Sequence, residues 1–277
     1  MPELPEVETL RRDLDREVVG KKIKTAEVVG RAGVTRLPKK QFISRLEGTK
    51  VTGGERRGLM LTLKLDSGDL LVFDLHEGGQ LLRTSAREPV VKGTRVVITF
   101  TQGGQLRAID AGGGLDVWVT TPDELLTDAP ALAELGLDPL DEPISWTTFG
   151  QLLLRRRAKL KAILTDPTAV AGLGPVYSDE ILHAAGLRHD RVSDGLSSQE
   201  MRRLYRALVE TLHEAAKHRG STLADGNYHD LAGKPGDYQG ELKVYERDGL
   251  ACKRCRAVVT KARLGGRSIY FCPECQV

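Results

Sequence analysis

The sequence predicts an α+β multidomain protein with a β-rich first half, a helical second half and a metal-binding module at its end. Residues 22–120 contain short apolar or alternating runs separated by glycine-rich turns, a pattern typical of a β-sandwich or barrel. Between residues 146 and 220, apolar residues recur at helical spacing. All four cysteines lie in the last 26 residues.

Length and composition limit the classes of protein that this chain can belong to. With 277 residues it is long enough for two domains, each with its own core. No apolar run approaches the ~20 residues needed to span a bilayer, and no secretion signal opens the chain. We therefore expect a soluble, cytoplasmic protein with no membrane partner. The net charge of +3 permits a polyanionic partner but does not require one.

The first residues, MPELPEV, allow two interpretations. Val7, Leu10, Leu14 and Val18 have helical spacing, so residues 5–18 are predicted to form an amphipathic helix that starts at Pro5. Under the simpler interpretation the acidic residues only stabilise the helix start. Alternatively, Pro2 permits removal of Met1, which would expose a nucleophilic secondary amine as the chain terminus. The local sequence alone favours the simpler interpretation.

The pattern along the chain predicts four parts. Residues 1–125 form the helix and β-sandwich domain, and the stretch 126–145, rich in Pro, Asp and Leu, is a linker. Residues 146–240 form a helical domain, in which SWTTFGQLLLRRRAKLKAIL reads as one helix and SSQE as a capping box that opens another. Residues 241–277 form the cysteine module. Within 221–250, Gly, Asp and Tyr predict a flexible loop.

The cysteines form two CxxC pairs, Cys252 with Cys255 and Cys272 with Cys275, separated by sixteen residues. This spacing is typical of a tetrahedral four-cysteine zinc site. Two disulfides are the weaker alternative in a chain without a secretion signal, and a redox pair would need a βαβ context that is absent. We predict one zinc ion with a structural role, because four thiolates leave no open position for a catalytic water.

Basic residues gather at two places. One run lies on the helix predicted after residue 146 and includes Lys161, and the other surrounds the cysteine pairs. A solvated face explains one such cluster. However, the sequence AGLGP follows the first run, and its glycines would let backbone N–H groups approach a phosphate. Nucleic acid is therefore the expected partner.

Four motifs together resemble the formamidopyrimidine-DNA glycosylase and endonuclease VIII family, whose members excise damaged bases from DNA. They are MPELPEVETLRRDL at the start, LGLDPL at 135–140, AGLGPVYSDEILHAAGL at 171–187, and ELKVYERDGLACKRC with FCPECQ at the end. The resemblance covers nearly the whole chain. It implies an N-terminal helix on a two-layer β-sandwich, a helix-two-turn-helix domain and a C-terminal zinc finger, with DNA bound between the halves.

The resemblance also implies roles for individual residues. Pro2, after loss of Met1, would attack C1′ of the damaged nucleotide, and Glu3 would act as the acid that assists ring opening, while Glu6 would only order the helix start. An α-amine with a pKa of about 8 is partly neutral at pH 7 and is a usable nucleophile. The residues expected to contact DNA are Lys161, Gly172, Gly174 and Arg267.

The chain departs from the family pattern at several positions that face DNA. Leu59 stands in place of a lysine, and Pro175 in place of an asparagine in the glycine turn. The residues that fill the gap left by an extruded base are replaced by Glu77, Gly113 and Gly114. Because flipping a base costs a few kcal/mol of lost stacking, we expect a non-standard lesion or a non-duplex substrate.

Two other functions remain open on the sequence alone. A DNA-binding protein that recognises damage with idle catalytic residues would explain the lost contacts, but not the retained MPELPE start. A zinc-ribbon transcription or ribosome-associated factor would explain the finger and the basic patches, but neither the start nor AGLGP. We expect a monomeric DNA repair glycosylase with abasic-site lyase activity that acts on damaged DNA, duplex or single-stranded.

Overall fold

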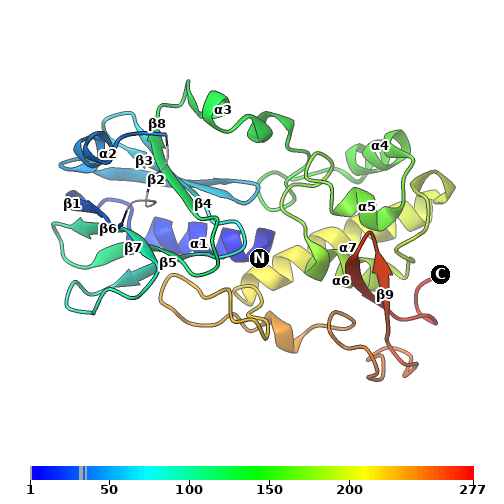
Figure 1. Ribbon diagram of the computed structural model, residues 1–277. Helices are drawn as coiled ribbons and strands as arrows, with labels where there is room; N and C mark the ends of the chain where they lie inside the picture. Colours follow the sequence, from blue (N-terminus) through cyan, green and yellow to red (C-terminus); the bar gives the residue numbers. More distant parts are fainter. Residues whose placement is uncertain (1, 31–33, 35) are drawn as a thin grey trace. The chain divides into compact units, whose positions relative to one another are not determined.

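A computed structural model describes residues 2–30, 34 and 36–277 (Figure 1). The expected removal of Met1 concerns a residue outside these ranges. The chain divides into two compact units. Unit 1 comprises Met1–Ala133 and His218–Asp237, and unit 2 comprises Glu134–Lys217 and Tyr238–Val277.

Unit 1 opens with helix α1 (Leu4–Glu17), which confirms the helix predicted from the spacing of apolar residues. Pro5 lies in its first turn, where a missing N–H costs nothing. Glu3 is the N-cap and forms a reciprocal capping box with Glu6. The apolar face of the helix is fully buried at Val7, Leu10 and Leu14.

Two four-stranded antiparallel sheets make up most of unit 1 and confirm the predicted β-sandwich. The first has the order β1-β6-β7-β5 and the second has the order β2-β3-β4-β8. The strands are β1 (Ile23–Val28), β2 (Val51–Arg57), β3 (Met60–Leu65), β4 (Leu70–Asp74), β5 (Gly79–Thr84), β6 (Thr94–Phe100), β7 (Gln105–Asp110) and β8 (Asp116–Thr120).

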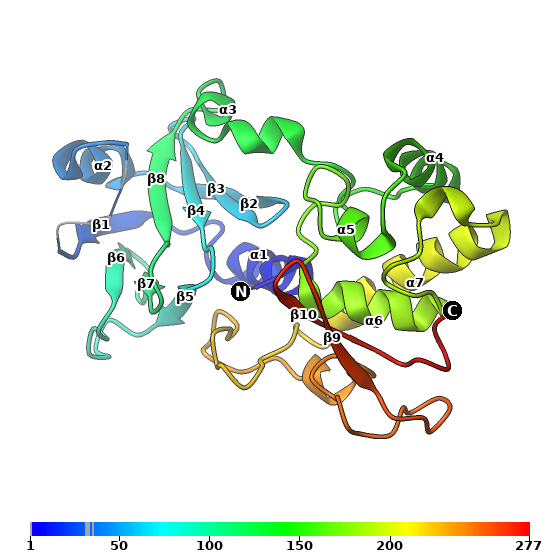
Figure 2. The ribbon, with the colours of Figure 1, turned by 45° about the vertical axis from the view of Figure 1, so that its right-hand side comes forward.

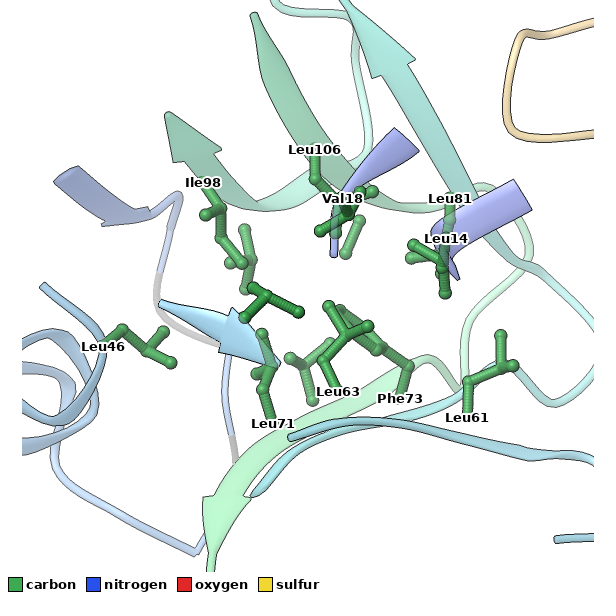
Figure 3. Close-up of a cluster of buried hydrophobic side chains, with 14 of the residues drawn as sticks. Leu14, Val18, Leu46, Leu61, Leu63, Leu71, Phe73, Leu81, Ile98 and Leu106 are labelled. Atoms are coloured by element: carbon green, nitrogen blue, oxygen red, sulfur yellow. The ribbon is translucent and has the colours of Figure 1, made fainter. Parts of the chain in front are cut away.

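The core of unit 1 lies between the two sheets and α1. Leu61, Leu63 and Phe73 of one sheet lie in the same buried cluster as Leu81 and Ile98 of the other (Figure 3). Leu61, Leu63 and Leu65 alternate along β3, which places one face of that strand in the core. Hydrophobic burial of this continuous cluster is the main term that stabilises the unit.

Helix α2 (Lys39–Leu46) was not predicted from the sequence. It follows Pro38 and buries only Phe42 and Leu46, so its apolar signal is short. Unit 1 ends its first segment with α3 (Leu125–Asp128), and the 3-10 helix η1 (Pro130–Glu134) spans the boundary to unit 2. In the stretch predicted as a linker, the structure therefore has short helical turns up to Glu134.

The segment 218–237 packs with unit 1, whereas the four-part division from the sequence groups it with the helical domain. Tyr228 and Leu231 belong to the same core cluster as the sheets. The glycine-rich composition predicted only a flexible loop, because two buried hydrophobic residues in an irregular segment leave no periodic signal.

Unit 2 contains the helices α4 (Trp146–Arg156), α5 (Leu160–Leu164), α6 (Pro175–Ala185) and α7 (Ser198–Lys217), the 3-10 helices η2 (Ser193–Gly195) and η3 (Tyr238–Gly240), and the hairpin strands β9 (Thr260–Leu264) and β10 (Arg267–Phe271). The predicted capping box is confirmed, since Ser197 N donates to Glu200 at 2.8 Å. Figure 2 shows the β9–β10 hairpin beside α6.

The single helix predicted over SWTTFGQLLLRRRAKLKAIL is wrong. Arg157 adopts a left-handed conformation with φ of 43°, which ends α4. The chain then pairs in an extended form, with a bridge between Lys159 and Val192, before α5 begins. This tertiary pairing overrides the local helix propensity, so the basic run is divided between two helices.

Among the described residues, no helix is long and apolar enough to cross a membrane.

Candidate active site and DNA-binding elements

Pro2 and Glu3 lie directly before α1, and both are buried. The Glu3 side chain is only 2% exposed. Its backbone N–H donates to Glu6 Oε2 at 2.8 Å, so the start of the helix is fixed by a local hydrogen bond. A carboxylate at this position is favoured by the helix dipole. The residues that the sequence assigned to catalysis therefore occupy an ordered, enclosed place in unit 1.

Glu6 joins two segments that are distant in the sequence. Its Oε1 accepts a hydrogen bond from Ser221 N at 2.7 Å. The neighbouring Gly220 has φ of +78°, and a Cβ there would lie 2.6 Å from Glu6 Oε1. Only glycine permits this approach without strain. Glu6 thus does more than order the helix start, the role that the sequence analysis gave it.

A second anchor lies two turns further along α1. Asp13 accepts from Arg219 at 2.5 Å, and Arg219 also bonds Asp230 at 2.7 Å. Burial lowers the pKa of Arg219, but hydrogen bonds and charge interactions with Asp13 and Asp230 outweigh it and raise the pKa overall. Together the two anchors fix the segment 218–237 to the helix whose N-terminus carries Pro2 and Glu3.

The paired arginines at the end of β2 have different environments. Arg56 is buried, and its Nε donates to Glu8 of α1 at 3.1 Å. Burial raises the pKa of Glu8, but hydrogen bonds and charge interactions with Arg11 and Arg56 outweigh burial and lower it. Arg57 is exposed. Leu59, which stands in place of the family lysine, packs against the core of unit 1, so this position supports the sandwich.

The two loops in which the sequence lacks gap-filling residues lie against each other. Ala111 N donates to Gly78 O at 2.9 Å, and a Cβ at Gly78 would lie 2.4 Å from Gly112 N. The two backbones therefore pack directly, and Gly78 is required for the contact. Gly113 and Gly114 both have positive φ. Glu77, which precedes Gly78 in the other loop, is exposed, so the loops offer no apolar side chain at the expected positions.

The glycine turn of AGLGP leads directly into α6. Gly172 has φ of +72°, a conformation that favours glycine. Gly174 is the N-cap, and Pro175 is the first residue of the helix. This explains why proline is tolerated at that position, since the first N–H of a helix has no intrahelical partner. The structure places the expected glycines at a helix N-terminus, a site at which backbone N–H groups bind anions.

The position of Lys161 contradicts the expected phosphate contact. The side chain is 6% exposed, and Nζ donates to Asp179 Oδ1 at 2.6 Å, Ser178 Oγ at 2.7 Å and Pro175 O at 3.0 Å. An ammonium has three donors, and all three point into unit 2. Burial raises the pKa of Asp179 to about 6 although Lys161 lowers it. Lys161 therefore fixes the start of α6 from within.

The four cysteines lie together in unit 2, and their ligand atoms are all within 4.8 Å of one another. The Sγ–Sγ distances are 3.4 Å for Cys255 to Cys272 and 3.9 Å for Cys252 to Cys275. A tetrahedral zinc with Zn–S bonds of about 2.3 Å requires sulfurs about 3.8 Å apart, so the cluster fits the ion. The four cysteines hold one structural zinc, as the sequence predicts.

The strands β9 and β10 meet in a tight hairpin with Leu264 opposite Arg267. Gly265 and Gly266 form its two-residue turn, and both have positive φ. Positive φ at both central positions suits a hairpin whose turn follows the strand twist. Arg267 is exposed directly after this turn.

Family models match three consecutive parts of the chain. Residues 1–112 match the formamidopyrimidine-DNA glycosylase N-terminal domain, residues 135–226 the formamidopyrimidine-DNA glycosylase H2TH domain, and residues 249–277 the zinc finger found in FPG and IleRS. The chain belongs to the formamidopyrimidine-DNA glycosylase family. It is an enzyme of DNA repair, a DNA glycosylase with abasic-site lyase activity, and its partner is DNA.

Individual relatives of this glycosylase agree over the full length. The Pelotomaculum thermopropionicum formamidopyrimidine-DNA glycosylase is 37% identical over 277 residues, covering 100% of this chain and 99% of the relative. The Geobacillus kaustophilus enzyme is 38% identical over 278 residues, covering all of both chains. Because the match spans every part of the chain, family membership does not rest on one motif.

Solved structures of relatives confirm the fold of the glycosylase. The complex of Lactococcus lactis Fpg with DNA that contains an abasic site superposes with a TM-score of 0.89 at 30% identity, covering 99% of both chains. The Thermus thermophilus MutM (FPG) protein superposes with a TM-score of 0.86 at 34% identity, covering 99% of this chain and 98% of that chain.

Sequence reasoning missed three contacts that shape the glycosylase site. These are the bond from Glu6 to Ser221, the anchor of Asp13 on Arg219, and the bond between His183 and the zinc ligand Cys252. Each joins residues more than 60 positions apart. For the first two contacts, acidic residues interspersed among the apolar positions of the opening helix were the available signal, because such groups are seldom buried without a partner.

Proposed function

We propose that Pro2 is the nucleophile and Glu3 the acid with which this glycosylase removes a damaged base. The observation that carries the proposal is the ordered start of α1, where both residues are buried and Glu6 fixes the backbone of Glu3. A terminal α-amine is partly neutral near pH 7. The place of Pro2 therefore suits a nucleophile that needs no separate strong base.

The proposed reaction balances with these two residues. The Pro2 amine forms a bond to C1′ while the bond from C1′ to the damaged base breaks, and the proton lost from the amine accompanies the departing base. Glu3 protonates the ring oxygen, the C1′–O4′ bond breaks, and the nitrogen lone pair completes an iminium. The Glu3 carboxylate left by this step then takes the acidified C2′ proton, the C3′–O3′ bond breaks, and the 3′-phosphate leaves, which cleaves the strand.

We propose that the substrate is a lesion in destabilised or single-stranded DNA, or a bulky base, and not 8-oxoguanine paired with cytosine. The support is the pair of loops that meet at Gly78 and Gly112 without an apolar filler. Filling side chains normally offset part of the cost of unstacking a base. An abasic site has no base to extrude, so lyase activity there is expected to be retained.

We propose that DNA phosphates contact the backbone of the Gly172–Gly174 turn and the exposed Arg267. The turn ends at the N-cap of α6, where the positive end of the helix dipole favours an anion. Arg267 follows two glycines at the tip of a hairpin, so its guanidinium can approach a backbone closely. Lys161 is not included, because its ammonium is held inside unit 2.

The substrate proposal is tested by comparing strand-cleavage rates on four oligonucleotides of the same length that differ in the lesion or in the strand context. They carry 8-oxoguanine opposite cytosine, 8-oxoguanine in a single strand, a bulky ring-opened purine in duplex, and an abasic site. We expect the first to be the slowest substrate. The variant Glu77→Met restores an apolar side chain to the loop and is expected to raise the rate on the first substrate selectively. Equal rates on all four, with no gain from Glu77→Met, would refute the proposed preference.

A further inference from the structure

A buried histidine lies against the zinc site without being one of its four ligands. His183 is on α6, is 2% exposed, and its Nε2 lies 3.4 Å from Cys252 Sγ. Neither the cysteine spacing nor the glycine turn requires a histidine at this position. A neutral imidazole has one N–H, and a metal-bound thiolate accepts hydrogen bonds.

The contact belongs to a wider junction between α6 and the zinc module. Asp179 accepts from Tyr270 N of β10 at 3.0 Å. Glu180 accepts three backbone N–H groups, from Lys243, Val244 and Tyr245, each at 2.9 Å. One helix therefore holds the module through successive polar side chains, and among them His183 alone reaches a metal ligand in the described residues.

The hydrogen bonds that the cysteine sulfurs accept within the zinc module show why the histidine matters. Cys252 Sγ accepts from Arg254 N at 3.4 Å, an interaction within its own CxxC turn. Cys272 Sγ likewise accepts from Cys275 N at 3.4 Å. The imidazole of His183 is thus an additional donor that comes from outside the module. Donors of this kind spread the negative charge of a ligand and hold its orientation.

We propose that His183 donates its Nε2–H to the Cys252 thiolate and is a positioning residue for the zinc, slowing metal loss and fixing the module to α6. Because Gly174 of the glycine turn is the N-cap of α6, movement of this helix would also move an element proposed to bind DNA. Loss of the N–H donor weakens the binding of zinc by Cys252 but leaves all four cysteine ligands in place. This role is independent of the substrate and of the Pro2 mechanism.

The test measures zinc release from the full-length protein into excess chelator, followed with a zinc-sensitive dye. His183→Phe keeps a ring of similar shape but has no N–H, while His183→Gln keeps a donor. His213→Phe, at an exposed position of α7, is the matched control. We expect release about tenfold faster or more for His183→Phe, a smaller change for His183→Gln, and the native rate for His213→Phe.

A second readout follows the ligand itself. In the cobalt-substituted protein, loss of the N–H donor is expected to shift the sulfur-to-metal charge-transfer band in His183→Phe and less so in His183→Gln. Native release and an unshifted band in His183→Phe would overturn the proposal. Equal acceleration in the Phe and Gln variants would also overturn it, because packing and not the donor would then be responsible. If His183→Phe does not fold, His183→Leu, which also lacks a donor, replaces it in both measurements, and a native release rate with an unshifted band in that variant would overturn the proposal.

Discussion

Glu6 and Ser221 are 215 positions apart and share a hydrogen bond of 2.7 Å. The same carboxylate accepts from Glu3 N at 2.8 Å. One buried side chain therefore fixes both the backbone beside Pro2 and the start of the segment 218–237. Rigid support of this kind is required of a reactive group, since small displacements of a nucleophile are costly in rate.

We expect Glu6→Gln to destabilise unit 1. An amide in place of the carboxylate must present its NH2 group to one of two N–H donors, and hydrogen bonds to a charged group contribute about 1.5–3 kcal/mol. The melting temperature should fall, and the rate of iminium formation should fall with it. Glu17→Gln, at a 47% exposed position of the same helix, is the control and should leave both quantities near native.

Gly220→Ala tests whether close approach to Glu6 is needed. Gly220 has φ of +78°, and its added Cβ would lie 2.6 Å from Glu6 Oε1. Gly226→Ala is the control, because Gly226 has φ of +64° with nothing within 4 Å. Both changes carry the backbone cost of about 1–2 kcal/mol. Thermal unfolding should show a larger loss for Gly220→Ala; equal losses would mean that the contact does not matter.

Lys161→Met should destabilise unit 2 by about 3–5 kcal/mol at pH 8, because it leaves Asp179 buried without its partner. Burial raises the pKa of Asp179 from 3.8 to about 6, with Lys161 opposing the shift. The pKa of Asp179 is higher in the folded than in the unfolded protein. The free-energy cost of burying its charged carboxylate is therefore present above pH 6 and fades as the pH falls through 6.

Removing the ammonium raises the folded pKa of Asp179 further, so the loss caused by Lys161→Met should be smaller at pH 5 than at pH 8. Lys159→Met, at an exposed position nearby, is the control and should show little loss at either pH. Denaturant unfolding at pH 5 and pH 8 measures the stability lost in each of the two variants. A loss that is the same at pH 5 and pH 8 would show that the ion pair is not its cause.

Arg267→Ala should weaken DNA binding through one lost phosphate contact. Each such contact contributes about −0.9 to the slope of log affinity against log salt concentration on duplex DNA. A salt titration should therefore give a slope shallower by about that amount. Arg206→Ala removes an exposed charge from α7 and should leave the slope unchanged. If both variants give the same slope, net charge and not a specific contact controls binding.

The sequence predicted the parts of this protein whose signal is local. The helix at Leu4–Glu17, the strands of the sandwich and the cysteine cluster each follow from periodicity or spacing within a short segment. The break between α4 and α5 was missed because the left-handed backbone of Arg157 leads into the pairing of Lys159 with Val192, a tertiary contact that no local pattern encodes. The role of Lys161 was misjudged because burial of a lysine depends on Asp179, a partner 18 positions away.

The sequence proposed residues for the candidate site but did not predict the contacts that hold those residues in place. Pro2, Glu3 and the glycines of the turn were named from motifs, and their burial and positions in the fold are consistent with those motifs. The residues that hold them, Glu6 through Ser221 and α6 through His183, depend on contacts that no single-sequence pattern encodes. Such contacts form only once the fold brings distant segments together.

The most direct test of the account is borohydride trapping on an oligonucleotide with an abasic site, followed by mass analysis of the tryptic peptides. Reduction converts the iminium into a stable adduct. The account predicts that the adduct lies on the peptide Pro2–Arg11, at the α-amine of Pro2, and that Glu3→Gln lowers its yield. An adduct on a lysine, or none on a protein that lacks Met1 and binds the oligonucleotide, would contradict the central claim.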